Sequence, residues 1–295
     1  MSITNKGLNI MNRIIIGTMN WGKWGKNLSI KEMSDKIKFC HDHALNTFDH
    51  ADIYGGYTTE SEFGKALKLS GINRNDLFFI GKCGIQYPCD SKNYVIKHYN
   101  YSKQHIINSV NNSLSNLNTE YLDLLLLHRP SPLMNTDIIS DAVDELIKKG
   151  KIKDFGVSNF KPSHIELLSK NIKISWNQIE FSISNSSPML DGTIDFHQIN
   201  DIGTMAWSPL GNFFKIDSPE NQRIKKIFES LNEKYNTNSE NLLLAWILKH
   251  PSKIHPIIGT TINDRVENAC NSLKINLDIE DWFSIFEAQK GERIP

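Results

Sequence analysis

YLDLLLLH, residues 121–128, is apolar at almost every position and ends on a histidine. A strand with one face in water alternates apolar and polar residues, whereas a strand covered on both faces of a parallel sheet reads as a continuous apolar run. Most of seven other short segments have the same continuous pattern: RIIIG (13–17), NTFD (46–49), LFFIGK (77–82), DFGVSN (154–159), ISWNQ (174–178), TMAW (204–207) and HPIIG (255–259). The sequence therefore predicts eight buried strands.

The segments between these runs have helical patterns. SIKE (29–32) is a capping box, after which apolar residues recur at three- and four-residue steps. Further helices are expected to begin near Thr59 and Pro219, and helices are expected to end at Gly71 and Gly150. The segment between Pro188 and Ile202 has no clear pattern.

Strand and helix thus alternate about eight times, with no proline-rich or serine-rich linker between them. A chain of 295 residues fits one (β/α)8 TIM barrel, for which ~250 residues are typical. We therefore expect a single barrel domain over residues 1–295. An open, doubly wound sheet is the alternative, but its GxGxxG turn is absent after the first strand, where Gly17 leads into Thr18-Met19-Asn20.

Composition argues against several function classes. Lys and Arg number 33 and balance 33 Asp and Glu without a basic block, so the electrostatic pattern of proteins that bind nucleic acid or anionic membranes is missing. The cysteines, Cys40, Cys83, Cys89 and Cys270, form no CxxC pair, which predicts reduced thiols and no metal site. No signal-like or membrane-spanning run is found. We expect a cytoplasmic protein with a small-molecule partner.

Polar or aromatic residues stand at the ends of the apolar runs. FDHADIYGGY (48–57) brings two carboxylates, a histidine and two tyrosines to the end of the second run, and Lys82 and His128 end the third and fourth. The C-terminal ends of all eight strands meet on one face of a (β/α)8 barrel, where active sites form. Each residue alone also fits a solvated strand end, but Asp49, Tyr54, Lys82 and His128 together supply acid chemistry.

Tyrosine is a weak acid at neutral pH, since its unperturbed pKa is ~10. An ammonium group beside it stabilises the phenolate, and a carboxylate paired to the ammonium keeps the lysine charged. We therefore interpret Tyr54 as a proton donor, Lys82 as the group that lowers its pKa and Asp49 as the partner of Lys82. His128 is a hydrogen-bonding group for the oxygen that is protonated. This set contains neither a reductant nor a nucleophile, so a bound cofactor is implied.

A metal-dependent hydrolase is an alternative from another enzyme class. Its ligands would come from His41, His43, His50, Asp49 and Asp52, but neither HExxH nor a comparable ligand spacing is present. His41 and His43 fall near the end of a predicted helix, where they also match the helix dipole.

Seven motifs resemble those of the aldo-keto reductase superfamily, (β/α)8-barrel enzymes that use nicotinamide cofactors. They occur in that family's order: FDHADIYGGY, IGKCGI, LLLLHRPSPLM, GKIKDFGVSNF, NQIEFS, AWSPLG and IIGTTINDRVENA. Two of them are most similar to segments of the small bacterial YdhF-type oxidoreductases. The resemblance implies reduction of an aldehyde or ketone to an alcohol by hydride transfer, with Asp49, Tyr54, Lys82 and His128 as catalytic residues and Tyr54 as general acid.

The same resemblance implies a cofactor site. Ser158, Asn159 and Gln178 match the residues that hold the carboxamide in this family, and Trp207 matches the aromatic residue that stacks on the nicotinamide ring. The complete set of implied cofactor residues is Thr18, Ser158, Asn159, Gln178, Trp207, Ser208, Leu210, Gly211, Asn212, Gly259, Thr260, Thr261, Arg265 and Asn268.

Cofactor preference depends on the segment GTTINDR. Asn263 is expected to cap a helix whose N-terminus suits a phosphate. Arg265 matches the family residue near the adenosine ribose phosphate, which favours NADPH. Gly259 stands where many members have a lysine, so NADH is the alternative.

Three residues are candidate substrate contacts. Trp21 and Trp24 follow the first strand, and Arg129 follows His128. The tryptophans fit packing against the segment 84–101 equally well, and a salt bridge is the alternative for Arg129. The long segment itself suits a lid or a surface cover. A non-enzymatic alternative also stays open, because the barrel resembles the cofactor-binding β subunits of potassium channels.

Overall fold

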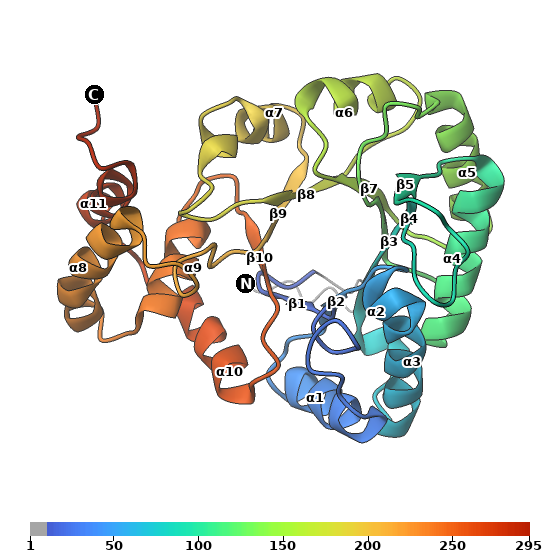
Figure 1. The fold of residues 1–295 in the computed structure, drawn as a ribbon, viewed down its shortest axis with the longest axis horizontal. Coiled ribbons are helices and arrows are strands. Elements are labelled where there is room, and N and C mark those ends of the chain that lie inside the picture. The colour runs from blue at the N-terminus through green and yellow to red at the C-terminus, as the bar shows by residue number, and fades with distance from the viewer. Residues whose placement is uncertain (1–10) are drawn as a thin grey trace, which may run out of the picture.

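A computed structural model describes residues 11–295, in which eight parallel strands close into a barrel (Figure 1). They are β1 (Ile15–Gly17), β2 (Thr47–Asp49), β3 (Phe78–Cys83), β6 (Leu124–Leu127), β7 (Phe155–Ser158), β8 (Trp176–Glu180), β9 (Gly203–Trp207) and β10 (His255–Ile258). Pairing of β10 with β1 closes the ring. Two further short strands, β4 and β5, form a hairpin and span Ile85–Gln86 and His98–Tyr99. All eight predicted strands are confirmed, and the fold is a (β/α)8 TIM barrel.

Helices surround the barrel (Figure 1). They are α1 (Ile30–Asp42), α2 (Tyr54–Tyr57), α3 (Thr59–Ser70), α4 (Lys103–Leu117), α5 (Thr136–Lys148), α6 (Pro162–Ser169), α7 (Thr193–Ile199), α8 (Pro219–Lys234), α9 (Ser239–Leu248), α10 (Asn263–Asn271) and α11 (Ile279–Lys290). The predicted capping box is present, since the Ser29 and Glu32 side chains each accept from the other's backbone N–H. Gly71 ends α3 with a φ of 72° and Pro219 opens α8, as predicted. No helix within residues 11–295 is long and apolar enough to cross a lipid bilayer.

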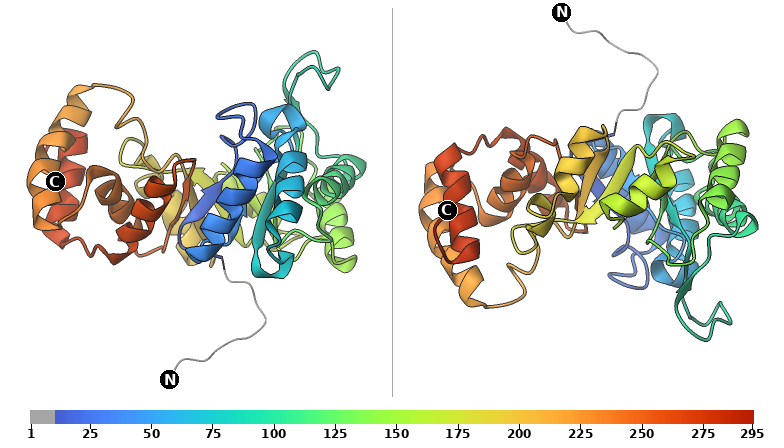
Figure 2. Two further views of the ribbon diagram at one scale, coloured as in Figure 1. Left: turned by 90° about the horizontal axis from the view of Figure 1, so that it is seen from below. Right: turned by 90° about the horizontal axis from the view of Figure 1, so that it is seen from above.

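The last helices pack beside the barrel rather than around it, with α8 and α11 at one end of the molecule (Figure 2). Arg223 on α8 donates through Nε to the carbonyl oxygen of Ala288 on α11 at 2.7 Å. Trp246 of α9 stacks on Trp282 of α11 with ring centres 4.8 Å apart. Each of these two indole N–H groups donates to the other residue's carbonyl oxygen, at 3.3 and 2.9 Å. These contacts fix α11 against both α8 and α9.

Alternation along the strands gives the barrel interior an apolar layer and a polar layer. One apolar cluster fills the barrel interior on the N-terminal side of the strand ends. It contains Ile15, Ile80, Leu124, Leu126, Met205 and Ile257. Successive side chains on one face of a strand are two residues apart. Lys82 therefore lies one layer above Ile80, and His128 one layer above Leu126, so the apolar layer supports a polar one at the C-terminal ends of the strands.

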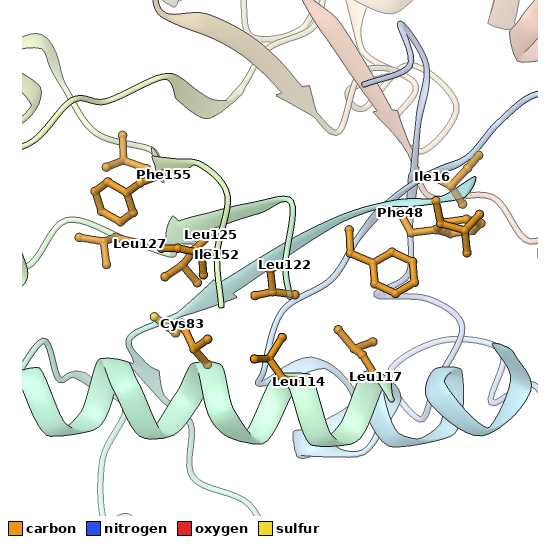
Figure 3. Close-up of a cluster of buried hydrophobic side chains, with 14 of the residues drawn as sticks. Ile16, Phe48, Cys83, Leu114, Leu117, Leu122, Leu125, Leu127, Ile152 and Phe155 are labelled. Carbon is orange, nitrogen blue, oxygen red and sulfur yellow. The ribbon is translucent and has the colours of Figure 1, made fainter. Parts of the chain in front are cut away.

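The outer faces of the strands form the main core with the surrounding helices. Figure 3 shows Leu114 and Leu117 of α4 directed at Leu122, with Leu127 and Phe155 of the neighbouring strands farther along the same cluster. These side chains are all buried. Since burial of such a side chain stabilises the fold by ~1.5–3 kcal/mol, packing of the strands against the helices holds the barrel closed.

The segment 84–101 is a hairpin that is attached to the rest of the chain. Tyr57 Oη accepts from the backbone N–H of Tyr87 at 2.9 Å, which ties the hairpin to α2. The hairpin stands out from the barrel in Figure 2. The segment 188–202, which has no clear sequence pattern, contains α7.

Candidate active site

Lys82 is the centre of the polar layer. Its Nζ donates to Asp49 Oδ1 at 2.7 Å, to the carbonyl oxygen of His50 at 2.8 Å and to Tyr54 Oη at 3.2 Å. These three acceptors satisfy all three protons of the ammonium group. The Lys82 and Asp49 side chains are 0% and 4% exposed, so the ion pair is buried. The structure thus brings together Asp49, Tyr54 and Lys82 from three separate elements.

Two glycines let Tyr54 face Lys82. α2 is a single turn, within which Gly55 and Gly56 have left-handed φ angles of 62° and 68°. Glycine adopts such angles without the steric penalty of a Cβ, and a Cβ on Gly55 would lie 2.5 Å from Thr59 Oγ1. The chain therefore turns sharply after Tyr54 and leaves its hydroxyl beside Lys82.

Burial and charge set the protonation states of Tyr54 and Lys82. Burial raises the pKa of Tyr54 above its ordinary value, and it outweighs the nearby Lys82 ammonium, which acts in the opposite direction. The expectation of a lowered Tyr54 pKa is therefore wrong for this structure. Burial also acts to lower the pKa of Lys82, but Asp49 and Tyr54 outweigh burial and raise it. At neutral pH, Tyr54 is a protonated phenol beside a charged lysine.

His128 follows β6 on the same face of the barrel. Its ring centre is 6.2 Å from that of Tyr54. Burial, together with the charges of Lys82 and Arg129, holds the pKa of His128 well below its ordinary value. Its Nδ1 is a buried atom with no hydrogen-bond partner within the described part of the chain. A neutral imidazole has one donor and one acceptor nitrogen, so His128 can bind an oxygen atom beside Tyr54 without carrying a charge.

Ser158, Asn159 and Trp207 form a second connected group. Ser158 Oγ donates to the carbonyl oxygen of Gln178 at 3.0 Å and accepts from Asn159 Nδ2 at 3.1 Å. Trp207 Nε1 donates to Asn159 Oδ1 at 3.0 Å. Asn159 has a φ of 59°, a strained value for a residue other than glycine and one that recurs at functional sites. These bonds fix the amide of Asn159 and the indole of Trp207 in one arrangement.

Gln178 joins the two groups. Its Nε2 donates to Asp49 Oδ1 at 2.9 Å, the same oxygen that accepts from Lys82. No sequence pattern indicates this contact, because 129 positions separate the two residues. The closed barrel brings β2 and β8 to face each other across its interior, where Gln178 helps to hold the carboxylate that positions Lys82.

Thr18 and His50 lie inside the barrel wall. Thr18 Oγ1 donates to the carbonyl oxygen of Asp49 at 3.0 Å and is hydrogen-bonded to His50 Nδ1 at 3.0 Å. The His50 ring packs against Phe63 and Phe79, and burial holds its pKa far below the ordinary value. Thr18 is 0% exposed, so the structure does not support its predicted cofactor contact; the residue fastens the end of β2 instead.

The loop after β9 is held by its own hydrogen bonds. Ser208 and Gly211 have left-handed φ angles of 50° and 55°. Asn212 Oδ1 accepts from Ser184 Oγ at 2.8 Å, and Leu210 packs partly buried against the core. The side chains of Leu210 and Asn212 therefore stabilise the loop, and its backbone is the part that can face a ligand.

The segment Gly259-Thr260-Thr261 leads into α10. Asn263 is the first residue of this helix, and its Oδ1 accepts from Lys36 Nζ at 2.6 Å. The N-cap position belongs to Ile262, whose side chain makes no capping bond. The prediction that Asn263 caps the helix is wrong, and no side chain caps α10. Lys36 is a basic group that sequence reasoning missed, because it lies 227 positions away.

Arg265 and Asn268 lie one turn apart on α10. Arg265 is 56% exposed and pairs with Glu240 at 3.4 Å. An exposed ion pair of this kind contributes only ~0.2–1 kcal/mol, so Arg265 can exchange this partner for a phosphate. Asn268 is partly buried. Gly259 is exposed, and its carbonyl oxygen accepts from Asn20 Nδ2 at 3.0 Å.

The two tryptophans after β1 have different environments. Trp21 is 0% exposed, and its ring lies 5.8 Å from that of Phe63 in the core. The prediction of Trp21 as a substrate contact is therefore wrong. Trp24 is 39% exposed, with its ring 6.2 Å from that of Tyr54 and 5.1 Å from that of Tyr87. Trp24 thus both packs on the hairpin and stands beside the proposed acid.

Arg129 lies beside His128 and Ser158. Its Nη1 donates to the carbonyl oxygen of His128 at 2.6 Å and to Ser158 Oγ at 3.2 Å. The predicted alternative of a salt bridge is not found, since none of the ion pairs among residues 11–295 includes Arg129.

The histidines of the hydrolase alternative fall in two places, His41 and His43 at the end of α1 and His50 after β2. His43 follows α1, where its Nδ1 is hydrogen-bonded to the carbonyl oxygen of Phe39 at 2.7 Å. His41 lies in the last turn of α1, and His50 is inside the barrel wall. Within the described residues, no three His, Cys, Asp or Glu side chains are arranged to hold a metal ion.

Comparison with known proteins agrees with this geometry. Residues 13–290 match the Aldo/keto reductase family. The chain is 41% identical to the "Uncharacterized oxidoreductase YcsN" of Bacillus subtilis, covering 96% of each chain. It is 38% identical to the oxidoreductase YdhF of Escherichia coli, covering 96% of this chain and 95% of YdhF. The thermostable aldo-keto reductase Tm1743, solved with the inhibitor epalrestat, shares the fold with a TM-score of 0.81, 24% identity and 98% coverage of both chains. The expected similarity to YdhF-type oxidoreductases is confirmed, and the chain belongs to the Aldo/keto reductase family.

Proposed function

We propose that this protein reduces aldehyde or ketone carbonyls to alcohols with NADPH, and that Tyr54 is the general acid. The observation that supports this most strongly is the buried unit in which Lys82 Nζ binds Asp49 at 2.7 Å and Tyr54 at 3.2 Å beside a neutral His128. A protonated phenol next to an ammonium group can protonate a carbonyl oxygen. These side chains supply no electrons, and a bound nicotinamide supplies the hydride.

Each residue of the unit has a separate task. Tyr54 Oη accepts from Lys82, so its own proton is left to donate to a carbonyl oxygen. As that proton leaves, the phenolate forms beside the Lys82 ammonium, which stabilises it strongly because the site is buried. Asp49, held by Gln178, keeps the ammonium in place. His128 donates a second hydrogen bond to the same oxygen.

The surrounding residues fit a nicotinamide dinucleotide. Asn159 offers an amide for a carboxamide, and Trp207 offers an aromatic face for the ring. Ser158 is fully buried, and its hydroxyl, which is bonded to Gln178, Asn159 and Arg129, holds the Asn159 amide in place. At the other end, α10 has no side-chain cap, and a helix N-terminus of this kind binds phosphate. Two basic residues near this end, Arg265 and Lys36, support NADPH rather than NADH.

The alternative, a regulatory subunit resembling the β subunits of potassium channels, is not favoured. The relatives matched over 96% of this chain are named as oxidoreductases. Cytoplasmic location is also proposed, and it is supported by the four cysteines, all of which are free thiols.

The test is NADPH oxidation, followed by absorbance, against aromatic aldehydes, quinones and short dicarbonyls. Tyr54→Phe removes the proton donor and should lower kcat by a factor of about 100 or more, while NADPH binding measured by fluorescence is kept. Tyr57→Phe is the matched control, because that hydroxyl binds the hairpin and not Lys82. Turnover by Tyr54→Phe at the rate of the control would show that Tyr54 is not the acid. An absence of carbonyl reduction in the wild type would contradict the proposed function.

A further inference from the structure

Arg129 is fixed in position directly after His128, through both its backbone and its side chain. The Tyr101 hydroxyl, which is buried, donates to the carbonyl oxygen of Arg129 at 2.5 Å and accepts from its backbone N–H at 3.2 Å. The guanidinium is held at one end, where Nη1 donates to His128 and Ser158 at 2.6 and 3.2 Å. Backbone and side chain are therefore ordered before any ligand binds, which reduces the entropy lost on binding.

The other edge of the guanidinium has no partner among residues 11–295. Nε and Nη2 of Arg129 make no hydrogen bond within residues 11–295, and neither is one of the fully buried polar atoms that lack a partner there. No carboxylate there lies within ion-pair distance of Arg129. Glu180, at the end of β8, acts on Arg129 electrostatically from farther away. Nε–H and Nη2–H form a planar pair of donors that matches two oxygens of one carboxylate or phosphate.

This free edge lies close to the reacting groups. Arg129 acts electrostatically on both Tyr54 and His128. Its guanidinium carbon is 5.9 Å from the centre of the Trp207 ring. Lys97 of the hairpin is a second positive charge that acts on His128. Arg129 therefore lies among the groups proposed to act on the carbonyl, bonded to the His128 carbonyl oxygen and to Ser158.

We propose that the preferred substrates are carbonyl compounds that carry an anionic group, a carboxylate or a phosphate, within a few bonds of the carbonyl, and that Arg129 binds this group. The inference rests on the proposed reductase function. The reaction is unchanged: the carbonyl carbon gains hydride from NADPH, its oxygen gains a proton from Tyr54, and the products are an alcohol and NADP⁺. The anionic group makes and breaks no covalent bond, so Arg129 determines specificity.

The test compares pairs of related carbonyl compounds, one that carries the anionic group and one that lacks it. Benzoylformate is compared with methyl benzoylformate, and glyceraldehyde 3-phosphate with glyceraldehyde, so the two pairs distinguish a carboxylate from a phosphate. Wild-type kcat/KM should be higher for the anionic member of at least one pair. Arg129→Met should lower kcat/KM for that anionic member about tenfold to hundredfold, the range for a hydrogen-bonded charge, with most of the change in KM. Because Arg129→Met also removes the hydrogen bonds to the His128 carbonyl oxygen and to Ser158, the neutral member should lose activity too, but less. The ratio of the two kcat/KM values, anionic over neutral, should fall about tenfold, and Arg129→Lys should restore part of that ratio.

A structural role for Arg129 gives a different result. If Arg129 only fixes His128 and Ser158, Arg129→Met lowers kcat/KM equally for both members of a pair, which would overturn the inference. Equal wild-type activity on both members, or preference for the neutral ones, would overturn it as well.

Binding measurements separate this inference from the proposed function. Benzoylformate and its methyl ester are titrated into the wild-type protein and into Arg129→Met by calorimetry, with and without NADP⁺. If no carbonyl is reduced but the wild type binds the acid and Arg129→Met does not, the reductase proposal fails and the anion site stands. If the acid and the ester bind equally to the wild type, and glyceraldehyde 3-phosphate and glyceraldehyde do so in the same titration, the anion site fails whether or not reduction occurs.

Discussion

Asp49→Asn tests how much the buried ion pair contributes to the stability of the barrel. The Lys82 and Asp49 side chains are 0% and 4% exposed and lie 2.7 Å apart. The amide of the variant still accepts a hydrogen bond, but it leaves the Lys82 ammonium buried without a counter-charge. Removing one member of a buried pair reduces the free energy of unfolding by about 3–5 kcal/mol. That is a large part of the free energy of unfolding of a typical domain, which is ~5–15 kcal/mol.

The pH dependence identifies the cause of this loss. Burial acts to lower the pKa of Lys82, and Asp49 is the first of the groups that oppose burial. Without Asp49, the folded-state pKa of Lys82 falls below its value of ~10.4 in the unfolded chain. The unfolded state then binds more protons, so the stability of the variant rises with pH. In the wild type the Lys82 pKa is raised, so its contribution is present at neutral pH and is lost only above the unfolded value.

The assay is urea unfolding followed by circular dichroism for the wild type, Asp49→Asn and Asp49→Asn/Lys82→Met. The deficit of the single variant should shrink between about pH 7 and about pH 9.5 as the lysine loses its proton. The double variant should be more stable than Asp49→Asn at neutral pH, because it buries no unpaired charge. A deficit that is the same at both pH values and in the double variant would refute the electrostatic reasoning.

Three further predictions concern other parts of the chain. Burial raises the pKa of Glu60 from 4.5 to about 7, so ionisation of Glu60 destabilises the fold as the pH rises from about 4.5 to 7. In urea titrations, Glu60→Gln should therefore be more stable than the wild type at pH 8 by up to about 3 kcal/mol, and the difference should be absent near pH 4. A Cβ on Gly64 would lie 2.0 Å from the carbonyl oxygen of Asn116, whereas a Cβ on Gly71 meets nothing within 4 Å. Thermal unfolding should therefore show that Gly64→Ala reduces the free energy of unfolding by about 3 kcal/mol and Gly71→Ala by only about 1 kcal/mol. Equal reductions would contradict the close contact between Gly64 and Asn116. Arg265→Ala should raise the KM for NADPH about tenfold and leave the KM for NADH unchanged in steady-state kinetics, and an equal rise for both cofactors would exclude a 2′-phosphate contact.

The strands and helices were predictable because their signals are local. A continuous apolar run such as LLLL (124–127) forms a buried strand, whichever segments of the chain cover its two faces. A capping box such as Ser29 to Glu32 satisfies backbone groups within one turn, and Gly71 ends its helix through its own φ angle. The alternation of these elements is compatible with few folds other than a barrel.

The predictions that the structure overturns concern residues whose contacts come from distant parts of the chain. The sequence makes Trp21 a candidate substrate contact, but its ring packs against Phe63 in the core. The sequence predicts Asn263 as a helix cap, but its amide oxygen accepts from Lys36 on another helix. The Tyr54 pKa was expected to fall, because the effect of Lys82 follows from residue type whereas the opposing effect of burial depends on the packed structure.

Local sequence specifies the elements, their order and the residue types at the ends of the strands, since each of these depends on neighbours within a few positions. Which of those residues meet depends on the packed fold. Closure of the barrel brings Gln178 to the carboxylate of Asp49 and leaves one edge of the Arg129 guanidinium without a partner in the described chain. Contact and burial depend on the three-dimensional path of the whole chain, and these two quantities set the protonation states and the free donors of the site.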